Sequence, residues 1–402
     1  MESWVAEYGE AGELLKSPLH ERHVALGAKF AAFGGWSMPL EYAGAGVLAE
    51  HAAVRNSVGI FDVSHLGKAT VAGPGAVDFV NRCVTADLGK ISPGRAQYTL
   101  LCNSDGGVVD DMIAYLKAPD EVFLIPNAAN CERVVALLAD AAPTGVRVSN
   151  QHRDFAVLAV QGTLSDEVLT STGMPAGHDY MTFVSAWYDD TPVTVCRTGY
   201  TGERGYELVV PSNAATALWD AVLTAGEPYG LQPAGLGARD TLRTEMGYPL
   251  HGQDISPTIT PIQARLGWAV GWKKGSFFGA DALRAEKQTG PKRLLRGLRA
   301  TGRGIPRPGM IVRGPDGHEV GVVTSGTFSP TLKIGIALAL IEVGLNDDDV
   351  VKVDIRSRQE SFVIAKPPFV TPGVREAGTK ARSRQASLAS EAIQNRSRDA
   401  PC

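Results

Sequence analysis

The stretch C-R-T-G-Y-T-G-E-R-G-Y-E, Cys196–Glu207, lies between two short runs that are rich in β-branched and apolar residues. Such runs are typical of strands. The glycines of the stretch reach backbone conformations that other residues avoid, so we expect a tight connection between two strands. It carries Tyr200 and the carboxylates of Glu203 and Glu207. Two interpretations fit: a ring and carboxylates that hold a flat, nitrogen-rich ligand, or a solvated turn with ordinary surface acids.

The totals of the chain exclude several classes of protein. Its 402 residues predict two or three domains, and its net charge of -4 argues against a general nucleic-acid binder. No apolar run is long enough to span a membrane, and residues 1–16 are too acidic for a secretory signal. The 5 cysteines lack zinc-type spacing and the even number of a disulfide framework. We therefore expect a cytoplasmic enzyme with reduced cysteines and no metal.

Two adjacent carboxylates, Asp110 and Asp111, lie within the strand predicted for residues 108–115. A second strand, 96–102, precedes it across a turn with a D-G step. Side chains alternate between the faces of a strand, so one of the two carboxylates must face largely apolar residues. A functional acid and a pair of groups that cap a turn both fit this pattern. Alternation alone does not choose between the two aspartates.

Two further sets of polar residues have simple structural interpretations. Asp62, Ser64 and His65 are the residue types of a hydrolase triad, but a triad is assembled from separate parts of a fold. We expect them to bond the backbone at the end of a strand. Arg239 and Arg243 lie four residues apart on one face of a predicted helix. Such arginines have an acidic partner or an anionic ligand, and a salt bridge to a neighbouring carboxylate, Asp240 or Glu245, is the simpler interpretation.

The order of the predicted elements favours an α+β fold over a doubly wound parallel sheet, because helices and strands alternate irregularly and hairpins occur among them. Dinucleotide and P-loop fingerprints are absent from the sequence, so NAD and ATP are unsupported. Residues 294–366 form short runs between turn signals, which is typical of a compact β-barrel or sandwich. We expect Ser212 to cap a helix over 214–225, and residues 374–402 to be a disordered tail.

Six motifs, in order along residues 18–370, resemble those of the T protein of the glycine cleavage system, a tetrahydrofolate-dependent aminomethyltransferase, and most closely its actinobacterial members. They are F-G-G-W-S-M-P-L (Phe33–Leu40), F-D-V-S-H (Phe61–His65), G-G-V-V-D-D (Gly106–Asp111), R-T-G-Y-T-G-E (Arg197–Glu203), A-G-L-G-A-R-D-T-L-R (Ala234–Arg243) and V-T-S-G-T-F-S-P (Val323–Pro330).

The resemblance implies three domains arranged like a cloverleaf around a central channel that binds folate. The folate-binding region is 1–288, built from two interleaved α+β domains, and a C-terminal β-barrel or jelly-roll domain spans 289–373. The interleaved domains are expected at approximately 1–56 with 148–238, and 57–147 with 239–288.

The resemblance also implies roles for individual residues. Asp111 matches the catalytic acid–base residue of the family, and Glu207 matches the carboxylate that holds the amino-pyrimidine edge of the pterin. Arg239 matches a binding residue. Three further positions match residues that line the folate site: Tyr200, Trp268 and Asn127. The chain departs from the family at two points, because Tyr180 stands where some members have phenylalanine and the C-terminal binding tyrosine has no counterpart after Pro367–Val370.

The implied reaction takes an aminomethyl group from the lipoyl arm of the H protein and passes its carbon to tetrahydrofolate. No metal, flavin or NAD takes part, and no nucleic acid or membrane partner is expected. Two alternatives stay open: a tetrahydrofolate-dependent demethylase of the same superfamily, and a non-catalytic folate-binding protein of iron–sulfur assembly. Proteins of the second kind carry a K-G-C-Y-x-G-Q-E motif, whereas the hairpin here reads R-T-G-Y-T-G-E and lacks that cysteine.

Overall fold

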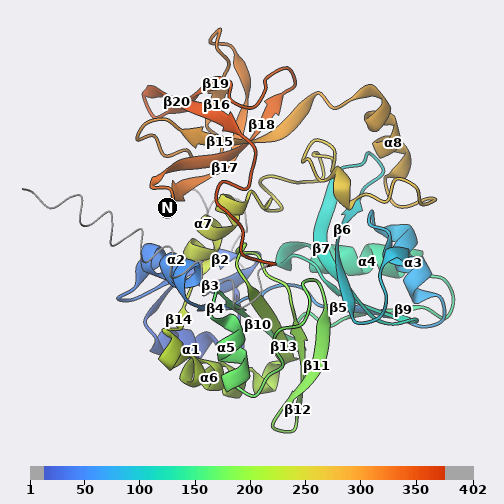
Figure 1. The fold of residues 1–402 in the computed structure, drawn as a ribbon. Helices are drawn as coiled ribbons and strands as arrows, with labels where there is room; N and C mark the ends of the chain where they lie inside the picture. The colour runs from blue at the N-terminus through green and yellow to red at the C-terminus, as the bar shows by residue number, and fades with distance from the viewer. Residues whose placement is uncertain (1–12, 376–402) are drawn as a thin grey trace, which may run out of the picture.

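Helix α7 (Leu236–Met246) lies among three large β-sheet assemblies and one small N-terminal sheet in the structure of the chain, a computed structural model that describes residues 13–375. A closed barrel lies at the top of Figure 1, and two open sheets with their helices lie below it. Helix α7 runs between them and contacts strands of the barrel. The expected α+β class with a C-terminal barrel is therefore confirmed.

The first open sheet contains the hairpin of the opening stretch and has the strand order β11-β12-β13-β10-β4-β14. Its strands are β4 (Gly59–Asp62), β10 (Phe155–Gln161), β11 (Phe183–Tyr188), β12 (Thr191–Cys196), β13 (Gly205–Pro211) and β14 (Gln232–Pro233). The side chains of strand β13 alternate between two faces, both of which are largely buried. Tyr206 and Leu208 pack with Trp219 on helices α5 (Ser165–Ser171) and α6 (Ala215–Gly226). Glu207 and Val209 therefore point to the opposite face, towards α7 and the second sheet.

The second open sheet holds the paired aspartates and has the order β6-β7-β8-β5-β9. Its strands are β5 (Ala69–Ala72), β6 (Arg95–Cys102), β7 (Val108–Ala118), β8 (Glu121–Ile125) and β9 (Arg147–Asn150). Helices α3 (Ala76–Cys83) and α4 (Cys131–Ala141) contribute to the core on one face. The register of β6 and β7 shifts at Leu101, so Val109 packs in the same core as Met112. This irregularity resets the alternation, and Asp111 points with Tyr115 towards the other face.

A small N-terminal sheet, β1-β3-β2, covers the side of α7. Its strands are β1 (Leu15–Lys16), β2 (Ala28–Phe33) and β3 (Trp36–Tyr42), with helices α1 (His20–Ala25) and α2 (Gly46–Asn56) beside them. Gly34 and Gly35 form the two-residue turn between β2 and β3 with φ values of 56° and 84°. A turn with two positive φ values needs residues of this kind. Helix α2 follows this hairpin directly.

The barrel closes in the order β15-β18-β17-β16-β19-β20. Its strands are β15 (Arg293–Ala300), β16 (Ile311–Arg313), β17 (Glu319–Ser329), β18 (Ile334–Glu342), β19 (Val350–Ile355) and β20 (Arg358–Ala365), and helix α8 (Ala280–Thr289) precedes them. Buried polar contacts fix the barrel to α7. Arg243 donates to Ser325 Oγ at 2.9 Å, and the carboxylate of Glu245 accepts from the hydroxyl of Ser329 at 2.5 Å. The barrel is thus held against the helix that carries Arg239.

Three expectations about the elements need revision. Helix α6 begins at Ala215 and its N-terminus has no side-chain cap, because the hydroxyl of Ser212 donates instead to the carbonyl of Arg153 at 2.7 Å. The expected tail at 374–402 begins too early, since residues 374 and 375 pack on the fold; residues 376–402 lie outside the described part. The interleaved domain division remains a proposal, and the place of β4 in the first sheet favours a boundary after residue 62 rather than at 56.

Candidate active site

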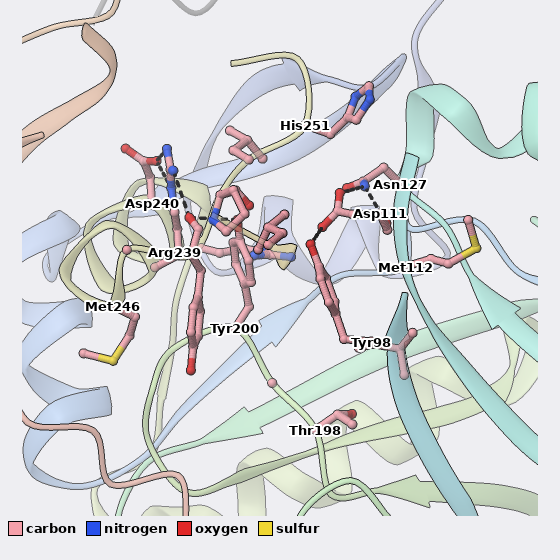
Figure 2. Close-up of a pocket in the computed structure, with 18 of the residues that line it drawn as sticks. Tyr98, Asp111, Met112, Asn127, Thr198, Tyr200, Arg239, Asp240, Met246 and His251 are labelled. Carbon is pink, nitrogen blue, oxygen red and sulfur yellow. Dashed lines mark hydrogen bonds and ion pairs between the residues drawn. The ribbon is translucent and has the colours of Figure 1, made fainter. Parts of the chain in front are cut away.

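A cavity of about 1260 Å³ lies between the two open sheets, α7 and the barrel. Side chains from each of these parts line it, and Figure 2 shows how several of them lie. All of the residues to which the resemblance gives a role are on its wall: Asp111, Asn127, Tyr180, Tyr200, Glu207, Arg239 and Trp268. Segments far apart in the chain therefore meet at one site, which is large enough for a drug-sized ligand.

Asp111 lies on the wall of the cavity and accepts two hydrogen bonds (Figure 2). The hydroxyl of Tyr98 donates to its Oδ2 at 2.9 Å, and Nδ2 of Asn127 donates to its Oδ1 at 2.8 Å. Burial raises the pKa of Asp111, while these hydrogen bonds and the nearby His251 act in the opposite direction. The result is a half-buried carboxyl that takes up a proton more readily than a surface aspartate does.

Asp110 is fully buried and is not on the wall of the cavity. Its carboxylate accepts from the backbone N–H of Asn127 at 2.9 Å, from Nδ2 of Asn127 at 2.9 Å and from Nδ2 of Asn130 at 2.7 Å. The structure thereby separates the two aspartates that alternation along the strand left equivalent: Asp111 faces the cavity, and Asp110 is buried behind it.

Tyr98 is a site residue that the sequence reasoning missed. Its ring stacks on Trp268 with a centroid distance of 5.5 Å and an interplanar angle of 26°. Trp268 lines the cavity and is 71% exposed, so it forms part of the rim. The cross-strand pairing contained the signal, because Tyr98 lies two residues from Leu100, which pairs directly with Asp111, and such diagonal neighbours interact.

Glu207 lies on another part of the wall, half-buried on β13 opposite Cys196 of β12. The hydroxyl of Thr198 donates to its Oε2. Burial raises the pKa of Glu207, and the hydrogen bond from Thr198 and the positive charge of Arg239 lower it. The carboxylate has further acceptor capacity towards the cavity, which suits a ligand with paired N–H groups.

Arg239 projects from α7 over the ring of Tyr200, with its guanidinium carbon 4.3 Å from the ring centroid (Figure 2). This is a cation–π contact. Among residues 13–375, Arg239 forms no salt bridge, and burial lowers its pKa. The simple salt-bridge interpretation therefore holds only for Arg243, which pairs with Asp240 at 2.7 Å and with Asp254 at 2.8 Å.

The glycine stretch packs against helices α7 and α2 and is not a solvated turn. Gly202 has a φ of 80°, and a Cβ there would lie 2.0 Å from the sulfur of Met246 on α7. Arg55 of α2 donates to the carbonyl of Thr201 at 2.7 Å and to Oε1 of Glu203 at 3.0 Å. Glu203 thus serves in a buried ion pair of the loop, and the interpretation of these residues as ordinary surface acids is wrong.

Arg375 is a second residue that the sequence reasoning missed. It lines the cavity, and its guanidinium carbon lies 5.4 Å from the ring centroid of Tyr180. The preceding segment is attached to the glycine stretch: Gly373 donates to the carbonyl of Gly202 at 2.8 Å, and Arg197 donates to the carbonyl of Val374 at 2.7 Å. No local pattern marks this position, because the surrounding composition is that of a polar tail.

The F-D-V-S-H segment forms no hydrolase triad. Asp62 accepts from the backbone N–H of Ser64 at 2.9 Å, and Ser64 Oγ accepts from the N–H of Val157 at 3.1 Å, as expected for groups at a strand end. His65 departs from that expectation, since its ring nitrogens have no hydrogen-bond partner within residues 13–375. Burial lowers the pKa of His65 to about 3, so its ring is neutral.

Residues 13–375 contain no cluster of three or more His, Cys, Asp or Glu residues able to hold a metal.

Comparison with known proteins identifies the family. The model described as "GCVT N-terminal domain" matches residues 19–274, and "Glycine cleavage T-protein C-terminal barrel domain" matches residues 293–371. An aminomethyltransferase of Parafrankia sp. is 62% identical over 364 residues, which are 90% of this chain and 100% of the relative. One from Mycobacterium bovis is 58% identical over 360 residues, 89% of this chain and 97% of the relative.

A solved structure agrees with these matches. The crystal structure of the glycine cleavage system aminomethyltransferase T from Bartonella henselae superposes with a TM-score of 0.85 and 35% identity, covering 90% of this chain and 99% of that one. The resemblance that the six motifs indicated is thus confirmed over most of the chain. The chain belongs to the aminomethyltransferase family, the T proteins of the glycine cleavage system.

Proposed function

We propose that this aminomethyltransferase takes the aminomethyl group carried on the lipoyl arm of the H protein and transfers its carbon to tetrahydrofolate. The products are methylenetetrahydrofolate, ammonia and the dihydrolipoyl form of the H protein. One observation carries the proposal: Asp111 and Glu207 line the same cavity, with Arg239 and Tyr200 also on its wall. This set offers an acid–base group, a carboxylate acceptor and an aromatic–cation platform in one enclosed space.

Glu207 and its neighbours suit the pterin ring. An ionised carboxylate accepts two N–H groups side by side, as the amino-pyrimidine edge presents them. Arg239 is held over Tyr200 and offers N–H donors that Glu207 lacks, so the two residues complement each other towards a heterocycle with both donors and acceptors. We assign Tyr180, Trp268 and Asn127 to the rest of the folate site, because all three line the cavity.

Asp111 suits the movement of protons. When the carbon bridges two folate nitrogens, those nitrogens lose two protons, of which one ends on the departing ammonia and one on the sulfur of the arm. Asp111 has a raised pKa and can take a proton from a folate nitrogen and return it to a leaving group. Tyr98 and Asn127 fix the orientation of its carboxyl during this exchange. Positioning of the two substrates in one cavity supplies a further share of the rate enhancement.

Arg375 offers a replacement for the C-terminal tyrosine that the chain lacks. Its guanidinium lies on the cavity wall against Tyr180, and arginine binds carboxylates in a bidentate manner. Tetrahydrofolate carries carboxylates on its glutamate tail, at the opposite end from the pterin. We assign Arg375 to this tail.

Two properties bear on the partner and the compartment. The cysteines within residues 13–375 are buried free thiols, which fits a reducing cytoplasm. Within the same residues, no helix is long and apolar enough to cross a lipid bilayer. The lipoylated H protein is the proposed partner, because the family acts within the glycine cleavage system.

The test is a transfer assay with the purified chain and H protein loaded with a labelled aminomethyl group. We expect label in methylenetetrahydrofolate and equimolar ammonia only when tetrahydrofolate is present. A chain that binds tetrahydrofolate but transfers no label would contradict the proposal. Parallel reactions with sulfonium and methoxy donors separate the demethylase alternative, since only that activity would form a methylated folate.

A further inference from the structure

Asp110 is a buried titratable group to which the proposed reaction gives no role. It is fully buried, lies next to Asp111 in β7 and is absent from the wall of the cavity. An isolated buried carboxylate is costly, so such a group needs either partners or a function. Asp110 has partners of a particular kind: all three of its hydrogen-bond donors are N–H groups from the turn between β8 and α4.

Asn127 links the two carboxyls. Its Nδ2 lies 2.9 Å from Oδ1 of Asp110, 2.8 Å from Oδ1 of Asp111 and 3.0 Å from the carbonyl oxygen of Asp111. An amide nitrogen has two hydrogens, so the two aspartates share the donors of one side chain. A link of this kind places two negative charges close together, and two adjacent carboxylates cannot both ionise without a large cost.

The hydrogen bonds differ between the two carboxyls. Asp110 accepts three N–H donors, two of them on one oxygen, and a set of two or three such donors holds a carboxylate in its ionised form. Asp111 accepts one hydroxyl and a share of Asn127, and it alone of the pair faces the cavity. Asp110 is therefore the more strongly hydrogen-bonded of the two carboxyls, and Asp111 is the one that can exchange a proton with the cavity.

We propose that Asp110 is a positioning residue that orients Asp111 through Asn127 and, by its negative charge, makes Asp111 hold a proton at a higher pH than it otherwise would. Asp110 touches no substrate in this account. The inference rests on the proposed acid–base role of Asp111, and it extends that role to a pair of carboxyls that titrate together. Burial raises the pKa of both carboxyls, and the charge of Asp111 raises that of Asp110 further, so the ionisation of each depends on the other.

Few other groups near the pair titrate in the working range. Burial raises the pKa of Tyr98 and of Tyr200, and it raises the pKa of Cys131 to about 11, so all three are neutral near pH 7. His251 is the remaining neighbour, and a positive charge on its ring would favour ionised Asp111. Its Nε2 donates to the carbonyl of Val108 and its Nδ1 accepts from Asn130, both at 3.0 Å. The tautomer with its hydrogen on Nε2 satisfies both contacts, and Asp110 is the acidic neighbour that shares the amide of Asn127 with Asp111.

The test is the pH profile of single-turnover transfer in Asp110→Asn, which removes the charge and keeps the shape. Turnover needs ionised Asp111 as a base, so the rate rises with pH through the pKa of Asp111. Removal of the neighbouring charge lowers that pKa, and we expect the rising limb to move about one to two pH units towards acid. The matched control is Asp105→Asn, an exposed aspartate in the turn of the same hairpin, whose profile should coincide with that of wild type.

A second variant acts on the same charge from the other side. Asn130→Ala removes one donor from Asp110 and leaves both bonds of Asp111 in place, so it should move the limb in the same direction by a smaller amount. Difference infrared titration of wild type against Asp111→Asn reports the proton on Asp111 without any activity. A wild-type chain with no transfer would count against the proposed function, whereas this titration still decides the role of Asp110. If neither variant moves the limb or the infrared titration, Asp110 only stabilises the fold and the inference is wrong.

Discussion

Replacement of Asp111 by asparagine separates the binding of folate from the chemistry. The substitution keeps the size of the side chain, and its Oδ1 can still accept the hydroxyl of Tyr98, which now lies 2.9 Å from the carboxylate. The new amide meets the amide of Asn127, so one hydrogen bond and the negative charge are lost. The substitution leaves the proposed pterin contact at Glu207 unchanged, since Glu207 is oriented by its own hydrogen bond from Thr198.

The size of each effect follows from these contacts. Loss of one hydrogen bond is worth about 0.5–1.5 kcal/mol, so the affinity for tetrahydrofolate should change by only a few-fold. Loss of a general base lowers rates by about 10² to 10⁴, or roughly 2.7 kcal/mol and more in the activation free energy. Asp111→Asn should therefore bind folate nearly as wild type does and react at least about a hundredfold more slowly.

Two assays measure the two quantities. Anaerobic calorimetric titration gives the dissociation constant for tetrahydrofolate, and rapid-quench transfer from loaded H protein at saturating folate gives the rate of the bound complex. Asp105→Asn in the same hairpin serves as the control for loss of a negative charge. If folate binding collapses while the bound complex reacts at the wild-type rate, Asp111 is a binding residue and the assigned role is wrong.

Three further predictions concern the rest of the site and the loop that carries it. Glu207→Ala should weaken folate binding about a hundredfold, since it removes charge-assisted hydrogen bonds. The affinity of the wild-type chain should rise with pH through the raised pKa of Glu207, because only the ionised carboxylate accepts two N–H groups. If folate binds to Glu207→Ala as tightly as to wild type, Glu207 is not part of the pterin site. Arg55→Ala should lower the free energy of unfolding by about 3–5 kcal/mol in chemical denaturation, because it removes a nearly buried guanidinium from two acidic partners. The control, Arg22→Ala at an exposed ion pair, should have no measurable effect. Equal losses of stability in the two variants would contradict the buried network. Arg375→Ala should raise the KM for tetrahydrofolate several-fold with little change in kcat. The control, Arg358→Ala in an exposed hairpin of the barrel, should change neither constant. An unaltered KM in Arg375→Ala would exclude the assigned contact with the glutamate tail.

Periodicity and turn chemistry predicted most elements because those signals are local. The strands predicted for residues 96–102 and 108–115 are β6 and β7. The prediction that Ser212 caps a helix is wrong for a physical reason. Its hydroxyl donates to a backbone carbonyl that lies 59 positions earlier in the chain, and no local pattern reveals that contact. The role of Asp111 was ambiguous for a similar reason, since the register shift at Leu101 decides which aspartate faces the cavity.

The site was less accessible from the residues alone. Local patterns left Glu207 and Arg239 open between structural and binding roles, and only the resemblance to a family chose between them. Tyr98 and Arg375 were missed, because each joins the cavity through a partner distant in sequence: Asp111 across a hairpin for one, and Tyr180 across 195 positions for the other. Such contacts depend on the assembled fold, and composition near Arg375 pointed away from any ordered role.

The most direct test of the site is a crystal structure of the chain with bound tetrahydrofolate. We expect both oxygens of Glu207 about 3 Å from the N–H groups of the amino-pyrimidine edge, and Asp111 within reach of the folate nitrogens that receive the carbon. A pterin bound elsewhere, or one that leaves Asp111 and Glu207 on unrelated surfaces, would contradict it.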